Sequence, residues 1–564
     1  MANTLNIVIG GEAGQGLVTV GDLLARSLVR SGYFIKVTQS YMSRIRGGHN
    51  FYTIRVSDEE VHAPQESIDL LVCLNEETYR IHKQELSTRG SVVADQAFGL
   101  ADVACMNIPY KDLGTGQAAN IVALGAVGAH LGLAEEVLRR AVEDSFGKKD
   151  PQIAEANRRV LSRSYQWAKT LPPCLPQLPP IPNPPVRLMM NGNEAIAIGA
   201  VSAGLKFYSF YPMTPSTSIG QNLANMAERM GLVVEQAEDE ISAINMALGA
   251  SFAGAPSMVG TSGGGFALMV EGVSLAGMTE TPVVIVVAQR PGPATGLPTR
   301  TEQGDLNFVL HAGHGEFPRA IFAPGSVEEC FHLTRRAFFL AEKYQGPVFI
   351  LTDHYLADSA SAIEPFALRN LAAVKPGSDP QSVKLPYLRF ALTESGISPR
   401  LLPGRSEHIV VAGSDEHTED GHLTEDLTVR RLMVEKRLRK AEGIRGEVVP
   451  PEFKGERKPD LLLMSWGSSK GAVGEAAAQM GKGGKRVATL HFSQVWPLVP
   501  DQFMEFLKEA QEVVSIESNA TGQFAGLIRR ETGFAIPRQI HRYDGLPITP
   551  EYILRGLNGE PWGR

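Results

Sequence analysis

The sequence has few cysteines, and none of them are spaced as metal or cluster ligands usually are. Only four of the 564 residues are cysteine, Cys73, Cys105, Cys174 and Cys330, and no two have C-x-x-C spacing. This pattern argues against a disulfide framework or a four-cysteine cluster, and it favours a cytoplasmic location. Any iron–sulfur centre that the activity needs must be carried by another chain.

Long apolar runs and a strong charge imbalance are also missing. No uninterrupted apolar run reaches about 18 residues, so we expect no membrane span. The opening MANTLNIVIGG lacks a cationic region followed by an apolar core and a cleavage site, so we expect no signal peptide. The net charge is -7 with both signs interspersed, which does not suggest nucleic acid or an anionic membrane as the main partner.

A run of prolines marks the clearest domain boundary. Eight of the fourteen residues from Pro172 to Pro185 are proline. Such a segment favours an extended, semi-rigid spacer that is not part of a core. The parts we expect are an α/β domain over residues 1–170, a proline-rich linker over 171–186, an α/β domain over 187–390, a charged connecting segment over 391–459, and an α/β domain over 460–564.

Strands alternate with helices in all three domains. The first opens with an apolar strand, a glycine-rich turn, and a helix with apolar residues at Leu17, Val20, Leu24 and Leu28. The second and third domains repeat this alternation, with strand-like runs such as VVIVVAQR and GPVFILTD. Alternating strands and helices predict mostly parallel α/β sheets. The charged connecting segment is expected to hold one exposed helix.

Two stretches of the first domain could hold a phosphate. GGEAGQG, with Gly14 and Gly16, lies at a strand-to-helix turn, where glycines let backbone amides approach an anion. A tight turn without a ligand explains it as well. SRIRGGHN places Arg44 and Arg46 before two glycines, which suits phosphate binding, a solvated loop or a subunit contact.

Two prolines bracket a threonine in the stretch YSFYPMTPSTSI. A Pro-x-Thr-Pro run cannot lie in the middle of a helix or a central strand, so we expect a rigid loop. The loop is either merely polar or built to hold the Thr214 hydroxyl against a substrate. The hydroxyls of residues 216–218 are expected to cap the helix that follows.

Three carboxylates, Glu238, Asp239 and Glu240, precede a helix of small residues, EISAINMALGASFAGA. Acid in a first turn suits the helix dipole, and this alone explains all three. A carboxylate at the start of a tightly packed helix would also be partly desolvated. It could then share a proton with a bound base.

A buried strand ends at Arg290 in the stretch VVIVVAQRPGPATGLPTRTEQGDL, which continues with Arg300, Glu302 and Asp305. Ligands of open α/β sheets bind beyond the carboxyl ends of the strands. An arginine there can clamp a carboxylate with both arms of its fork. An ion pair between the arginine and an acid of the loop is the alternative.

An acidic and histidine-rich stretch, SDEHTEDGHLTED, resembles metal-ligand material. Its spacing yields no complete tetrahedral or octahedral set, so a solvated acidic loop is the favoured interpretation.

Four motifs follow one another along the second domain: YPMTPST, QAEDEISAINMALGAS, TSGGGFALM and QRPGPATGLPTRTEQGDL. They resemble the α subunit of the 2-oxoacid:ferredoxin oxidoreductases, in particular the 2-oxoglutarate type. IGGEAGQG and GYFIKVTQSYMSRIRGG resemble the family's γ domain, here fused ahead of α. LLLMSWGSSKGAV, HFSQVWPL and SIESNATGQF resemble its transketolase C-terminal-like domain. The middle domain would then be the pyrimidine-binding thiamine diphosphate domain.

The resemblance implies an enzyme that uses thiamine diphosphate to decarboxylate 2-oxoglutarate, reduces ferredoxin and forms succinyl-CoA from coenzyme A. No Gly-Asp-Gly magnesium motif is present, so this chain would hold half of an active site. A β subunit would supply Mg²⁺, the pyrophosphate contacts and a [4Fe-4S] cluster, in an αβ or α2β2 assembly. The alternatives are the same chemistry on pyruvate or branched-chain 2-oxoacids, or a non-oxidative thiamine diphosphate lyase or transferase.

The resemblance also implies roles for single residues. Glu240 would bond the ring nitrogen of thiamine and act in catalysis, with Glu238 as the second choice. Thr214 and Arg290 would bind the substrate carboxylate and take part in catalysis. Further candidates are Thr299 and Arg300 for the substrate, Tyr211 and Pro212 for the thiamine cofactor, and Gly14, Gly16 and Arg46 for coenzyme A. No residue is expected to bind a metal.

Overall fold

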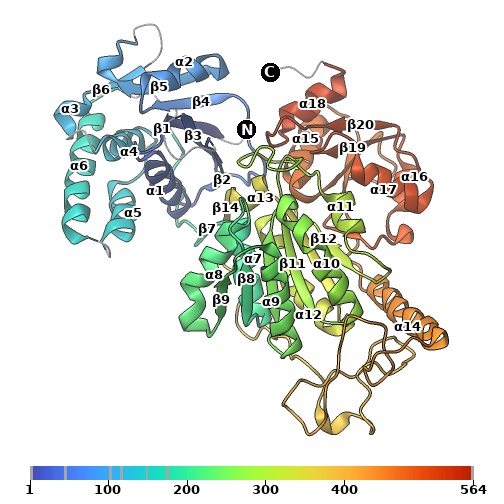
Figure 1. Cartoon of the computed structure of the whole chain (residues 1–564). Helices are drawn as coiled ribbons and strands as arrows, with labels where there is room; N and C mark the ends of the chain where they lie inside the picture. The colour runs from blue at the N-terminus through green and yellow to red at the C-terminus, as the bar shows by residue number, and fades with distance from the viewer. Residues whose placement is uncertain are drawn as a thin grey trace. The chain divides into compact units, whose positions relative to one another are not determined.

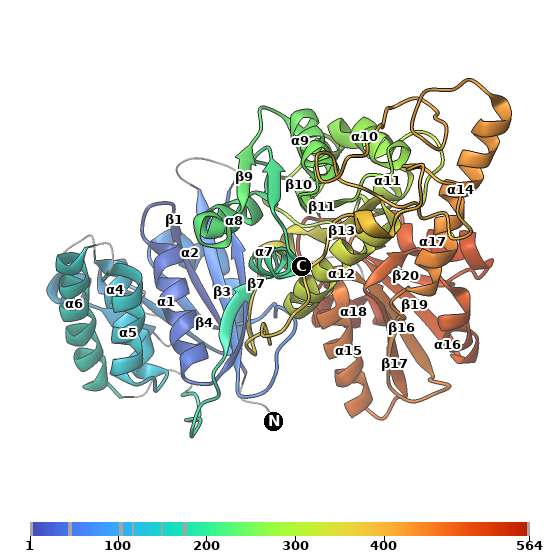
Figure 2. The same ribbon diagram turned by 90° about the horizontal axis from the view of Figure 1, so that it is seen from below.

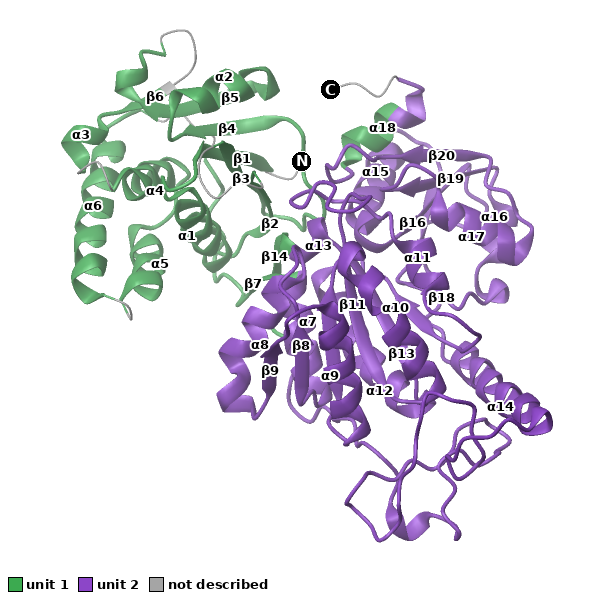
Figure 3. Cartoon of the chain, viewed as in Figure 1, with its two compact units in different colours: residues 1–191, 358–366, 549–555 green, residues 192–357, 367–548, 556–564 purple. Residues whose placement is uncertain are grey.

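The computed structural model describes residues 4–42, 48–100, 105–114, 118–147, 150–172 and 177–560. Its strands form three sheets, which confirms the predicted α/β fold class (Figure 1). Two compact units contain them (Figure 3). Unit 1 comprises residues 1–191, 358–366 and 549–555, and unit 2 comprises 192–357, 367–548 and 556–564.

Unit 1 is built on a mixed eight-stranded sheet. Its strands, in spatial order, are β6 (Cys105–Ile108), β5 (Leu86–Asp95), β4 (Ile68–Cys73), β1 (Leu5–Glu12), β3 (His49–Ser57), β2 (Phe34–Ser40), β14 (Ala360–Ile363) and β7 (Leu188–Asn191). The expectation of a mostly parallel sheet is wrong here, because β3 inserts antiparallel between β1 and β2. β7 and β14, which are distant in sequence from β2, complete the edge in antiparallel pairs.

The helices of unit 1 bury apolar side chains, and the first of them does so at the positions predicted from the sequence. They are α1 (Leu17–Arg30), α2 (Glu76–His82), α3 (Tyr110–Leu113), α4 (Ala119–His130), α5 (Glu135–Phe146) and α6 (Pro151–Lys169). All four apolar positions predicted for α1 are buried. Figure 2 shows α1, α4, α5 and α6 on one side of β3 and β4.

The proline-rich linker packs on unit 1. Leu178 belongs to the hydrophobic core, and its amide donates to the Leu131 carbonyl at 3.1 Å. The Tyr33 hydroxyl donates to the Pro179 carbonyl at 2.6 Å. The prediction that the linker contributes nothing to a core is therefore wrong for its second half, because Leu178 is buried in the core and Ile181 packs against it.

Unit 2 contains two sheets that share one hydrophobic core. The seven-stranded sheet runs β18 (Gln494–Trp496), β12 (Ala320–Phe322), β13 (Pro347–Asp353), β11 (Val283–Gln289), β10 (Ser257–Thr261), β8 (Phe207–Phe210), β9 (Val233–Gln236). All neighbours pair in parallel except β18 with β12. The central strands are continuous buried runs, which is typical of a parallel sheet covered on both faces.

The third sheet has five strands, four of which lie within residues 460–564, where an α/β domain is expected from the sequence. Its order is β15 (Glu452–Lys454), β17 (Val487–Phe492), β16 (Leu461–Trp466), β19 (Glu512–Glu517), β20 (Arg538–His541). Only β15 is antiparallel to its neighbour. Figure 2 shows α15 (Lys470–Lys482) on one side of this sheet and α16 (Met504–Glu509) on the other.

The remaining helices follow β7 along the chain. They are α7 (Gly192–Ala203), α8 (Thr217–Met230), α9 (Glu240–Phe252), α10 (Gly263–Met278), α11 (Leu306–His311), α12 (Val327–Tyr344), α13 (His354–Asp358), α14 (Leu427–Gly446), α17 (Gln523–Thr532) and α18 (Pro550–Asn558). In the described part of the chain, none of the helices combines the length and apolarity that crossing a bilayer requires.

Candidate active site

The carboxyl edge of the seven-stranded sheet gathers the predicted catalytic residues. β8 leads into the loop of Thr214, β9 is followed by Glu240, and β11 ends one residue before Arg290. β10 leads directly into the first turn of α10 at Gly263. Because neighbouring parallel strands end at the same edge, these loops lie beside one another, where open α/β sheets bind ligands.

Arg290 and Thr214 meet at this edge. The Arg290 Nη1 donates a hydrogen bond of 2.7 Å to the backbone carbonyl of Thr214. Burial lowers the pKa of the Arg290 guanidinium, and Asp305 acts in the opposite direction. A partly desolvated guanidinium with further N–H donors suits a carboxylate ligand.

The loop of Thr214 is fixed from below by a buried amide. Asn193 Nδ2 donates to the Pro215 carbonyl and to the Ser218 hydroxyl, both at 2.8 Å. Ser216 stands at the N-cap of α8, but its hydroxyl donates to the Met213 carbonyl at 2.8 Å. The prediction that Ser216 caps the helix with its side chain is therefore wrong, since the hydroxyl stabilises the loop instead.

Glu240 is the buried carboxylate of the three predicted from sequence. Its side chain lies in the first turn of α9 and is 3% exposed, whereas Glu238 is exposed. Among the described residues, Glu240 Oε1 is buried without a hydrogen-bond partner. Burial raises the pKa of Glu240. An unpaired, desolvated carboxyl oxygen suits a proton held jointly with a ligand base.

Glycines of the TSGGG turn make room for this carboxylate. A Cβ on Gly265 would lie 2.3 Å from Glu240 Oε1 and 2.2 Å from Thr261 Oγ1. Both contacts are shorter than any real Cβ makes, so only glycine fits unless its neighbours move. Gly264 differs, because the nearest atom to its Cβ position would be the Ala294 carbonyl at 3.6 Å.

A second carboxyl group, Asp305, lies against the same turn. A Cβ on Gly263 would stand 2.4 Å from Asp305 Oδ2. Burial raises the pKa of Asp305 to about 6, against the opposing effect of Arg290. Burial, followed by the charge of Asp305, also raises the pKa of Glu302. The Arg290 loop is thus a place where carboxyl groups hold protons unusually well.

The other predicted site residues are spread more widely. Thr299 and Arg300 are half-buried in the loop after β11, and Arg300 packs against Gly545. Tyr211 and Pro212 are exposed directly after β8. Gly14 and Gly16 lie in unit 1, in the turn between β1 and α1, with positive φ angles of 98° and 76°. Arg46 lies outside the described residues.

Known proteins match nearly the whole chain. A model of the pyruvate flavodoxin/ferredoxin oxidoreductase thiamine diphosphate-binding domain matches residues 198–436, and a pyruvate ferredoxin/flavodoxin oxidoreductase model matches residues 6–167. The 2-oxoacid:ferredoxin oxidoreductase subunit alpha of a Sulfolobus species is 31% identical over 98% of this chain and 96% of its own length. The chain belongs to the 2-oxoacid:ferredoxin oxidoreductase family.

Two further relatives of this oxidoreductase subunit have more specific names. The 2-oxoglutarate oxidoreductase subunit KorA of Mycobacterium tuberculosis is 30% identical over 93% of the chain and 87% of its own length. A structure of 2-oxoglutarate:ferredoxin oxidoreductase from Magnetococcus marinus, with 2-oxoglutarate, coenzyme A and succinyl-CoA bound, is 32% identical. It covers 99% of both chains with a TM-score of 0.91. The predicted family, fold and α-subunit type are confirmed.

Sequence reasoning missed how the Arg290 loop of this oxidoreductase subunit is held. The Gln303 side chain donates to the Trp466 carbonyl and accepts from the Ser518 amide, both at 3.0 Å. The loop after β11 is thereby tied to the ends of β16 and β19 in the third sheet. No local signal could reveal this, because the partners lie more than 160 residues away.

The helix of the charged connecting segment, α14, packs against the end of α10 through buried ion pairs. The expectation that this helix is exposed is therefore wrong. Lys436 and Lys440 of α14 both pair with the Glu280 carboxylate, and all three side chains are buried. Arg389 donates to the Glu280 carbonyl at 2.8 Å and to Gln345 Oε1 at 3.1 Å. We call Glu280, Lys436, Lys440 and Arg389 the buried clamp. Its cations lie at the C-terminal ends of α10 and α12, where they offset the helix dipoles.

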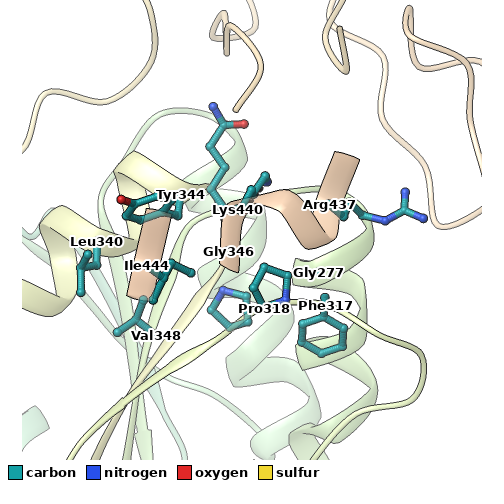
Figure 4. Close-up of a pocket in the computed structure, with 12 residues that line it drawn as sticks. Gly277, Phe317, Pro318, Leu340, Tyr344, Gly346, Val348, Arg437, Lys440 and Ile444 are labelled. Carbon is teal, nitrogen blue, oxygen red and sulfur yellow. Dashed lines mark hydrogen bonds between the residues drawn. The ribbon is translucent and has the colours of Figure 1, made fainter. Parts of the chain in front are cut away.

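A cavity beside this clamp is separate from the candidate active site. It borders the start of β13, at the amino edge of the sheet, and Figure 4 shows Phe317, Tyr344 and Ile444 around it.

The acidic and histidine-rich stretch also holds α14 in place, because Glu416 accepts two hydrogen bonds from Arg437, at 3.0 and 2.8 Å. No cluster of three potential metal ligands occurs in the described part of the chain.

Proposed function

We propose that this chain is a fused γ–α subunit of a 2-oxoglutarate:ferredoxin oxidoreductase that forms succinyl-CoA. The observation that carries the site assignment is the buried Glu240 carboxylate with its unpaired Oε1. The similarity over 99% of the chain to an enzyme with 2-oxoglutarate and succinyl-CoA bound supports the choice of substrate.

The described residues fit a bound thiamine diphosphate. The unpaired Oε1 of Glu240 offers the acceptor that the protonated aminopyrimidine ring nitrogen needs, and the raised pKa favours a shared proton. Tyr211 and Pro212 lie at the end of β8, next to β9, which leads to Glu240. When bound, thiamine diphosphate supplies the carbanion that attacks a keto carbon and stabilises charge during decarboxylation.

The oxoacid carboxylate is assigned to Arg290. Its guanidinium is held by the Thr214 carbonyl, so its orientation is fixed before substrate arrives. The Thr214 hydroxyl and Thr299 would add neutral donors. Arg300 would add the second cation that a dicarboxylate needs and pyruvate does not.

Coenzyme A is assigned to the β1–α1 turn of unit 1, together with Arg46. Space around Gly14 is open, because a Cβ there would meet no atom within 4 Å. The N-cap of α1 is Gly16, with the Asn120 side chain against it, and the amides of a helix's first turn favour an anion.

A β subunit is the proposed partner, and it would bring Mg²⁺, the pyrophosphate contacts and a [4Fe-4S] cluster. Large apolar side chains are exposed on the two helices that flank the candidate site: Ile241 and Met246 on α9, and Leu268 on α10, at 50%, 41% and 51% exposure. We call these three residues the α9–α10 face. Its apolar character suits a protein interface. The assembly would be αβ or α2β2 in the cytoplasm, with ferredoxin as electron acceptor.

The test is co-expression with a candidate β subunit and an assay of coenzyme A-dependent viologen reduction. We expect activity with 2-oxoglutarate above that with pyruvate and branched-chain 2-oxoacids. Preference for another oxoacid would correct the substrate alone. No coenzyme A-dependent reduction with any oxoacid, in a complex with intact clusters and thiamine diphosphate, would refute the proposal.

A further inference from the structure

Asp305 is fastened to the end of the strand that carries Arg290. Its amide donates to Gln289 Oε1 at 2.9 Å, and Gln289 is the last residue of β11. The Gln289 side chain is itself buried and donates to the Thr352 carbonyl on β13 at 3.1 Å. Asp305 is therefore held in place next to Arg290, although fifteen positions separate them in sequence.

One oxygen of the Asp305 carboxyl group lacks a hydrogen-bond partner among the described residues. This oxygen is Oδ2, and it is buried. The oxygen lies so close to the backbone of Gly263 that a Cβ there would stand 2.4 Å away. Leaving a buried carboxyl oxygen unpaired costs free energy, so the position calls for a functional reason.

Two charged groups affect this carboxyl and its surroundings. The positive charge of Arg290 favours the ionised form of Asp305 and so lowers its pKa. The negative charge of Asp305 in turn repels the carboxylate of Glu302, in the same loop, and raises the pKa of Glu302. Burial dominates, because it raises the pKa of Asp305 to about 6 in spite of Arg290. The group therefore changes its charge close to neutral pH, beside the cation assigned to the substrate.

We propose that Asp305 is a positioning residue that couples binding of the oxoacid carboxylate at Arg290 to the uptake of a proton. The inference rests on the role of Arg290 proposed above. Ionised Asp305 and an arriving carboxylate compete for the same guanidinium. Binding therefore draws a proton from solvent onto Asp305, and departure of the ligand releases it. The neutral carboxyl leaves the charge of Arg290 to the substrate.

Calorimetry on the complex with its β subunit tests this coupling directly. The ligand is glutarate, a dicarboxylate that cannot be decarboxylated, and it is titrated at pH 7 in two buffers of different ionisation enthalpy. We expect net proton uptake with the wild type and none with Asp305→Asn. Glu302→Gln is the matched control, since it removes a carboxylate from the same loop, and it should retain the uptake.

Kinetics provide a second readout. The KM for 2-oxoglutarate should rise about 2- to 5-fold from pH 6 to pH 8 in the wild type, as a coupling of half to one pKa unit implies for a group with a pKa of about 6. It should stay level in Asp305→Asn, with kcat changed little. A wild type without proton uptake, or an Asp305→Asn variant that keeps both the uptake and the pH step, would overturn the inference. A wild type inactive on every oxoacid would instead refute the proposed function.

Discussion

Gly265 lies directly against the carboxylate of Glu240, and a methyl group at position 265 would stand 2.3 Å from Glu240 Oε1. The carboxylate belongs to the start of α9 and the glycine to the first turn of α10, so the two helices together define the position of the acid.

This relationship predicts that Gly265→Ala displaces the acid. We expect a loss of turnover of at least about tenfold and weaker thiamine diphosphate binding, because the group that holds the ring nitrogen moves. Gly264→Ala is the matched control, since its new methyl group would meet only the Ala294 carbonyl, at 3.6 Å. Equal activity of the two variants would contradict the prediction. Cofactor titration and steady-state rates measure it.

Glu240→Gln should abolish turnover and leave assembly with the β subunit intact. The amide keeps the shape of the side chain but cannot accept and return a proton as the carboxylate does. Glu238→Gln, on an exposed side chain, should retain activity. If the two results are reversed, Glu238 is the acid.

Arg290→Ala should raise the KM for the oxoacid about 100-fold, within the range for truncating one member of a desolvated charge pair. Arg290→Lys should recover part of the loss, because a lysine keeps the charge but not the fork. Steady-state kinetics on the complex give the answer, and an unchanged KM would remove Arg290 from substrate binding.

Glu280→Gln should destabilise unit 2 by about 3–5 kcal/mol, since it leaves Lys436 and Lys440 buried without their carboxylate. Glu435→Gln is the control, because its ion pair with Arg431 is exposed.

The stability supplied by Glu280 also depends on pH. The attraction of the lysines and Arg389 outweighs burial and lowers the pKa of Glu280 to about 2, below its usual 4.5. The clamp therefore stabilises the fold above about pH 4.5 and loses this contribution as the pH falls towards 2.

Thermal unfolding followed across pH measures this effect. The melting temperature of the wild type should exceed that of Glu280→Gln near neutral pH, and the difference should shrink below pH 4.5. A difference that is constant down to pH 2 would show that the clamp contributes by packing rather than by charge.

Unit 1 contains a histidine pair that also loses stability in acid, but over a higher pH range than the clamp. His49 Nε2 and His82 Nε2 lie 2.8 Å apart, and His82 Nδ1 lies 2.7 Å from Glu85 Oε2. Burial, reinforced by His82, lowers the pKa of His49 below 6.5. Unfolded chains then bind more protons, so stability should fall as the pH drops below about 6.5. Hydrogen exchange at β1 and β3 should accelerate from pH 7 to 5.5, less so in His49→Gln, whereas the exposed His62→Gln should behave as wild type.

Leu268→Glu in the α9–α10 face should prevent co-purification with the β subunit, because a charge would be buried in an apolar contact. Leu385→Glu, on a side chain that is 71% exposed elsewhere in unit 2, should not. Co-purification of both variants would place the β subunit on another surface.

The sequence by itself determined the α/β class, the strand that ends at Arg290, the rigid loop of Thr214 and the acidic start of the helix at Glu240. These follow from local periodicity and from turn chemistry, which a short window of residues contains. The choice between Glu240 and Glu238 depends on which side chain is buried, and only the packing of the helices shows that it is Glu240.

Tertiary structure alone decided the contacts between distant segments. The completion of the unit 1 sheet by β7 and β14, the attachment of Gln303 to the third sheet, and the burial of Lys436 and Lys440 all join residues more than 100 positions apart. The charge pattern of α14 predicts an exposed helix, because the sequence does not show that Lys436 and Lys440 pair with the buried carboxylate of Glu280. In the sequence Asp305 is only one acid of a loop, and the structure alone shows that it lies against Gly263 with an Oδ2 that is buried and has no hydrogen-bond partner among the described residues.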